Sequence, residues 1–167
     1  MKKLITALLL AVLCMGLSAP ALAEAPSYEV TKSFVAVLEK NELAYEFEGK
    51  ISNGEERISM FNRDENFSYT INIFFDEDND QASVYVWNII TFADEDFANV
   101  LRVVNELNYS YKYIRFYADE TDNTVTCAMN MILHDNDEAG DIILEGLLRI
   151  ASILKVAYPP LGVYNVE

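Results

Sequence analysis

Acidic side chains gather in one short stretch of this sequence and could bind a cation. Residues 76–80 read Asp-Glu-Asp-Asn-Asp, which places oxygen ligands at alternate positions as a calcium loop does. An EF-hand loop also needs glycine at its sixth position and glutamate at its twelfth, where this chain has Gln81 and Trp87. We therefore interpret 76–80 as a solvated turn between two strands. A weaker, open cation site shared with Asp119, Glu120 and Asp122 is the alternative.

Two further side chains could do chemistry. His134 stands beside Asp135, Asp137 and Glu138, but it is the only histidine and has no second ligand at helical or strand spacing. A structural or surface role is therefore favoured over acid–base or metal chemistry. Cys127 lies in an apolar alternation without a nearby base, which indicates a buried core thiol. Catalysis needs paired groups that we do not find, so we expect no catalytic residues, no metal and no cofactor.

Two hydrophobic periodicities predict the elements that would position these residues. Helical spacing indicates helices at 27–41, from Phe97 to Leu107 with Asn108 as an end cap, and at 138–158, stopped by Pro159 and Pro160. Alternating apolar residues indicate five strands, at 57–61, 68–75, 82–90, 111–119 and 124–133. The predicted fold is a single α+β domain of α-β-β-β-α-β-β-α order, with a mostly antiparallel five-stranded sheet packed against helices.

One face of this sheet is predicted to be aromatic. If Ile71, Ile73, Val84 and Val86 point toward the helices, the residues between them point the other way. The predicted set on that second face is Phe74, Tyr85, Trp87, Tyr113, Arg115 and Tyr117. Tyrosine, tryptophan and arginine dominate interface energies, so we expect a partner-binding or dimer surface there. The alternative is that the third helix or the tail 161–166 covers this face.

Residues 1–23 have the three parts of a secretory signal peptide. Lys2 and Lys3 supply the positive start, 4–17 is nearly all apolar, and Ala21-Leu22-Ala23 fits the cleavage site. The apolar run is short for a membrane span, and Leu13 before Cys14 disfavours a lipid anchor. We expect a cleaved signal peptide, a domain at 24–167, export to the periplasm or the medium, and no membrane insertion after cleavage.

The charge of the chain limits its partners. The 167 residues include 12 basic and 27 acidic ones, for a formal net charge of −15. Without Lys2 and Lys3, 10 basic and 27 acidic residues give −17. Phosphate backbones would repel such a chain, so we expect no nucleic-acid binding, whereas a protein partner or a homodimer fits. Only Cys127 follows residue 23, which excludes an intramolecular disulfide in the cleaved chain.

A local motif adds a family resemblance. Val103-Val104-Asn105-Glu106-Leu107-Asn108 ends the second predicted helix, and Arg115-Phe116-Tyr117-Ala118-Asp119 follows in a strand. With these motifs, in which Asn105 and Asn108 are the family-motif residues, the order of elements over about 28–160 resembles the YbjN-domain family. Its members are described as bacterial sensory transduction regulators, and their fold is similar to that of type III secretion chaperones. The resemblance implies a regulatory domain with no established catalytic residues to carry over.

These observations lead to one expected function and one alternative. The expected function is an exported, non-enzymatic binding or regulatory domain that acts through chaperone-like protein–protein interaction. The alternative is a small-ligand or divalent-cation-binding module of the cell envelope. Chaperones of the similar fold work in the cytosol, whereas this chain has an export pattern, so a client inside the cell does not fit.

Overall fold

The computed structural model describes residues 25–64, 66–133 and 138–166, which form one antiparallel sheet with helices on one side. The sheet has six strands in the order β1-β2-β3-β4-β6-β5. The strands are β1 (Glu46–Lys50), β2 (Glu56–Arg63), β3 (Ser68–Phe75), β4 (Gln81–Thr91), β5 (Arg115–Asp119) and β6 (Thr124–Ile132). The helical segments are α2 (Glu29–Lys40), η1 (Asp94–Asp96), α3 (Phe97–Ser110) and α4 (Ala139–Gly162). The α+β class and the antiparallel sheet are confirmed.

The prediction of five strands is wrong, because β1 adds a sixth at the sheet edge. This strand reads Glu-Phe-Glu-Gly-Lys and pairs with β2 through an irregular register around Gly49, which has a φ of 75°. Tyr45, Phe47 and Ile51 do alternate with Glu46, Glu48 and Lys50, but Gly49 interrupts this short apolar series, and the prediction missed the strand. The fourth predicted strand, which is β5 in the structure, also begins later than expected, at Arg115 rather than at residue 111.

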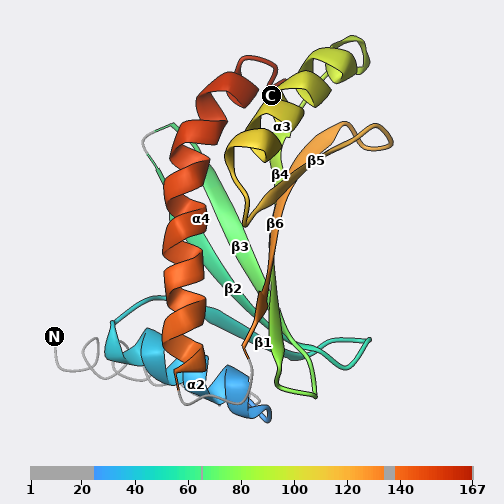
Figure 1. The fold of residues 1–167 in the computed structure, drawn as a ribbon. Coiled ribbons are helices and arrows are strands. Elements are labelled where there is room, and N and C mark those ends of the chain that lie inside the picture. Colours follow the sequence, from blue (N-terminus) through green and yellow to red (C-terminus); the bar gives the residue numbers. More distant parts are fainter. Residues whose placement is uncertain (1–24, 65, 134–137, 167) are drawn as a thin grey trace, which may run out of the picture.

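The three α-helices of the described residues cover the same face of the sheet. Figure 1 shows α4 running along the sheet, α2 crossing one end of α4, and α3 beside β5 at the other end. The main core lies in this layer, where α4 contributes Ile143, Leu147, Ile150 and Leu154. These side chains pack with the apolar set of β3, β4 and β6. The face predicted to point toward the helices therefore does so.

The prediction that Pro159 and Pro160 stop the last helix is wrong, since α4 continues through both to Gly162. Each proline removes one backbone hydrogen bond within the helix, which normally ends it. Here the last turn is anchored, because Ala157 and Leu161 are fully buried in the core. The ring of Tyr158 also stacks on Phe67, with centroids 4.1 Å apart. This packing offsets the lost hydrogen bonds.

Among the described residues, no helix is long and apolar enough to cross a bilayer.

Candidate functional site

The second face of the sheet carries no helix in the described part of the chain. Its residues alternate with the core set, so Tyr85 and Trp87 of β4 point away from the buried Val84 and Val86. The chain end does not cover this face either. The N–H of Val166 donates to the carbonyl of Thr91 at 2.7 Å, and Asn165 Oδ1 accepts from the N–H of Thr91. The tail is thus bonded to the end of β4, and the alternative in which α4 or the tail covers the face is wrong.

Three aromatic rings from neighbouring strands meet on this open face. Phe74 of β3 lies 5.8 Å from Tyr85 and 5.8 Å from Trp87, measured between ring centroids. Tyr85 and Trp87 are nearly parallel at 5.9 Å. Such pairs add to the energy of area burial and hold one another in place. Phe74 is 8% exposed, whereas Trp87 is 43% exposed. Within the cluster, Phe74 is therefore buried and the Trp87 ring is accessible to a partner.

Two further predicted residues lie on the same face, on β5. Tyr85 is opposite Ala128 of β6, and Ala128 is opposite Arg115 of β5. Tyr117 follows two residues later and is 46% exposed. Ala128 and Arg115 both line a hollow on this side of β5.

The sixth predicted residue, Tyr113, does not join the aromatic cluster. It precedes β5, and its ring lies 5.4 Å from the guanidinium carbon of Arg149 on α4. Strand alternation could not place it, because the chain is not yet in the sheet at this residue. Phe61 of β2 is an exposed apolar residue that the prediction missed; it is 69% exposed and alternates with the buried Ile58 and Met60. We call Phe61, Phe74, Tyr85, Trp87 and Tyr117 the aromatic face.

The charges of the open face differ from those of the whole chain. At the β1 side, Arg57 is ion-paired with Glu48. Along β3, β4 and β6, the open positions hold only neutral side chains, among them Thr70, Asn72 and Asn130. The protein therefore places its strong negative charge elsewhere, and a partner can approach this face with little charge repulsion.

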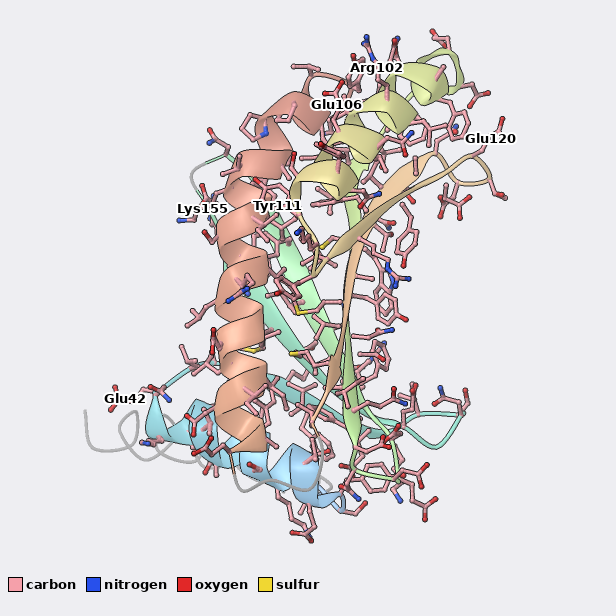
Figure 2. The ribbon with its side chains drawn as sticks, in the orientation of Figure 1. Glu42, Arg102, Glu106, Tyr111, Glu120 and Lys155 are labelled. Atoms are coloured by element: carbon pink, nitrogen blue, oxygen red, sulfur yellow. The ribbon has the colours of Figure 1, made fainter. Side chains whose placement is uncertain are left out.

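The acidic loop 76–80 connects β3 and β4 and helps to cap a helix. Asn79, at a φ of 59°, accepts the N–H of Val30 on its side-chain oxygen at 3.1 Å. The prediction of a turn between strands is confirmed. Asp119, Glu120 and Asp122 lie at the other end of the 11-residue β4, roughly 30 Å away at about 3.3 Å per residue. Figure 2 shows Glu120 far from α2. The shared cation site is therefore wrong, and no group of three metal-ligating side chains occurs among the described residues.

Glu56 completes the cap of α2. This carboxylate is 1% exposed and accepts the N–H and hydroxyl of Ser27, both at 2.6 Å, and the N–H of Tyr28 at 3.3 Å. Burial raises the pKa of Glu56, but the hydrogen bonds from Ser27 and Tyr28 outweigh it, so the net pKa lies below its ordinary value. A buried negative charge at the positive end of a helix is a stabilising arrangement.

The remaining predicted residues have structural positions. Cys127 is fully buried, and burial raises its pKa to about 12, which confirms the core thiol. His134 lies outside the described residues. Asn105 is exposed on α3, beside a hollow lined by Leu101 and Tyr109. Asn108 is not an end cap, because α3 continues to Ser110; its amide instead bonds the backbone of Phe116 on β5.

Two adjoining hollows lie where β5 begins, each about 220 Å³ in volume. The first is cationic and polar, and Lys112, Tyr113, Arg115, Tyr117, Ala128, Met129 and Asn130 line it. The second lies between β6 and α4, and Tyr113, Met129, Asn130, Met131, Ile142, Glu145, Gly146 and Arg149 line it. They share Tyr113, Met129 and Asn130. Sequence reasoning missed this pair, because it joins three separate segments.

Comparison with known proteins identifies a family. A model of the YbjN family, described as "Putative bacterial sensory transduction regulator", matches residues 34–153, which is most of the chain and runs from α2 into α4. No curated protein matches the sequence.

Proposed function

The chain belongs to the YbjN family, and from this premise we propose that it is a non-enzymatic regulatory domain that binds protein through its open sheet face. The observation that carries the proposal is the aromatic cluster of Phe74, Tyr85 and Trp87 on a face that no described helix covers. Large exposed apolar patches on a soluble domain mark interaction sites. Six strands and about eight residues per strand give a footprint of roughly 750 Å², close to the ~800 Å² per partner of a stable complex.

The partner that we propose for this face is a second copy of the chain. Two copies carry the same negative charge and repel each other over most of their surfaces. The open positions of β3, β4 and β6 are neutral, so joining two aromatic faces brings the fewest like charges together. A twofold axis through this face would place each Trp87 in a self-complementary contact.

Light scattering on the purified protein tests this proposal. We expect the mass of a dimer, and we expect Tyr85→Ala with Trp87→Ala to reduce it to the mass of a monomer. Tyr109→Ala with Leu148→Ala is the matched control, because it removes two exposed apolar side chains of α3 and α4 that lie off the aromatic face. A monomeric wild type, or a double variant of unchanged mass, would overturn the dimer.

We also propose that the domain acts outside the cytosol. The support is the arrangement of Lys2, Lys3, the apolar run and Ala21-Leu22-Ala23 described above. Mass spectrometry of the protein purified from a secreting host should find Glu24 as its first residue. A mature product that retains residues 4–17 would contradict export by cleavage.

A further inference from the structure

The C-terminal part of β6 lies at an edge of the sheet. Pairing between β5 and β6 ends at Arg115 and Ala128, whereas pairing between β6 and β4 continues to Ile132. Within the described part of the chain, residues 129–132 of β6 therefore have a strand on one side only. Figure 1 shows this part of β6 extending past β5, with α4 alongside.

The register shows which backbone groups point to the free side. The N–H of Leu133 donates to the carbonyl of Asp80, on the β4 side, at 2.7 Å. Backbone groups alternate along a strand, so those of Ile132 and Asn130 point away from β4. The hydrogen bonds at the other end of β6 give the same assignment of backbone directions. Asn108 bonds Phe116 on the outer side of β5, so the groups of Arg115 point inward to Ala128, which lies on the same side of β6 as Asn130.

Side chains around this edge form two different subsites. The cationic hollow has Lys112 and Arg115, and neither takes part in any of the ion pairs formed among the described residues. Asn130 adds an amide, and none of the lining residues is acidic. The neighbouring hollow has Met129, Met131 and Ile142 around Gly146, where a Cβ atom would lie 2.6 Å from Met131 Sδ. Methionines adapt their shape to different apolar ligands.

We infer that this edge binds an extended segment of a partner protein, which adds to β6 beside Asn130 and Ile132. The segment would place a carboxylate against Lys112 and Arg115 and an apolar side chain in the methionine-lined hollow. Lys112 and Arg115, which form no ion pair among the described residues, are electrostatically complementary to an acidic side chain of a ligand. Free backbone groups select an extended chain, and the two hollows select its side chains.

This inference rests on the binding function proposed above. The edge site shares Tyr117 with the aromatic face, but it does not use Phe74, Tyr85 or Trp87. Failure of the aromatic-face dimer would therefore leave the edge site standing. Conversely, if the protein dimerises as proposed but binds no extended segment, only the edge-site inference is refuted.

The probe is a random decapeptide library displayed on phage and selected against the purified protein. We expect the selected peptides to share an Asp or Glu close to one apolar residue. Fluorescence anisotropy on a synthetic copy of a selected peptide should show that Lys112→Glu with Arg115→Glu weakens binding at least about tenfold, as the loss of one charge-assisted hydrogen bond would. The control is Lys40→Glu with Arg102→Glu, which makes the same change of charge on α2 and α3. It should leave the affinity for the peptide within about twofold of wild type. Figure 2 shows Arg102 away from Tyr111, the residue that precedes Lys112.

Hydrogen exchange then locates the peptide. Strand addition predicts that the amides of Asn130 and Ile132 become protected when the peptide binds, and that methylating alternate peptide nitrogens abolishes binding. Three results would overturn the inference. The library could yield no binding peptide, the selected peptides could lack a carboxylate, or the two charge-reversal variants could lose equal affinity for the peptide. The inference would also be overturned if the peptide protected only amides of the aromatic face from exchange. The same holds if the amides of Asn130 and Ile132 were already protected without peptide, by a second copy of the chain.

Discussion

Asn108 and Phe116 are joined by two hydrogen bonds between the last turn of α3 and the outer edge of β5. The side-chain nitrogen of Asn108 donates to the carbonyl of Phe116 at 3.0 Å, and the N–H of Phe116 donates to Asn108 Oδ1 at 2.8 Å. One side chain thus satisfies both outward-pointing backbone groups of this residue, as a seventh strand would. Edge strands need such protection because free backbone groups invite unwanted pairing.

Replacing Asn108 with alanine should lower the free energy of unfolding by about 1–3 kcal/mol, because both backbone groups of Phe116 lose their partner. Urea unfolding followed by circular dichroism measures the change. Asn105→Ala, on an exposed position of the same helix, should stay within about 0.5 kcal/mol of wild type. Equal effects of the two substitutions would show that the bridge to β5 contributes nothing.

Glu56→Gln should lower the free energy of unfolding by about 1–3 kcal/mol at neutral pH, because the buried carboxylate accepts three hydrogen bonds at the start of α2. The folded pKa of Glu56 lies below its ordinary value of 4.5. Its contribution is therefore fully present above about pH 4.5 and is lost as the pH falls through the folded pKa.

The difference in unfolding free energy between wild type and Glu56→Gln, measured at pH 7, 5, 4 and 3, should shrink toward zero at the acid end. Using the difference removes the effect of the other carboxylates, whose protonation changes both proteins alike. Glu55→Gln, whose side chain bonds Asn53 and not α2 in the described structure, is the matched control and should give a smaller difference at pH 7. A Glu56 difference that stays constant to pH 3 would refute a depressed pKa.

Gly140 is where α4 crosses α2, and a Cβ atom there would lie 2.6 Å from the carbonyl oxygen of Ser33 and 2.8 Å from Val37 Cγ2. Gly140→Ala should therefore lower the melting temperature, at a cost of about 1–3 kcal/mol, since a backbone atom cannot move aside easily. Gly146→Ala is the matched control on the same helix. Its Cβ would meet Met131 Sδ, the mobile end of a side chain, and the helix would gain up to about 1 kcal/mol in propensity. A melting temperature that falls more for Gly146→Ala would contradict this account of the helix crossing.

Local periodicity predicted much of the fold. Alternation over 68–75 and 82–90 correctly separated Val84 and Val86 from Tyr85 and Trp87, because a strand sends successive side chains to opposite faces. Where the periodicity was weak or absent, prediction failed. The alternation around Glu46–Lys50 is short and is interrupted by Gly49, and Tyr113 lies outside any strand.

The sequence alone determined the alternation, the acidity, the lone core cysteine and the family resemblance, because each depends on residues close together in the chain or on composition. Only the tertiary structure decided that Glu56 and Asn79 cap the same helix, that Leu161 holds α4 past two prolines, and that Lys112, Asn130 and Gly146 meet at one edge. These contacts join residues far apart in the chain. Their geometry comes from packing the whole core, which no local pattern contains.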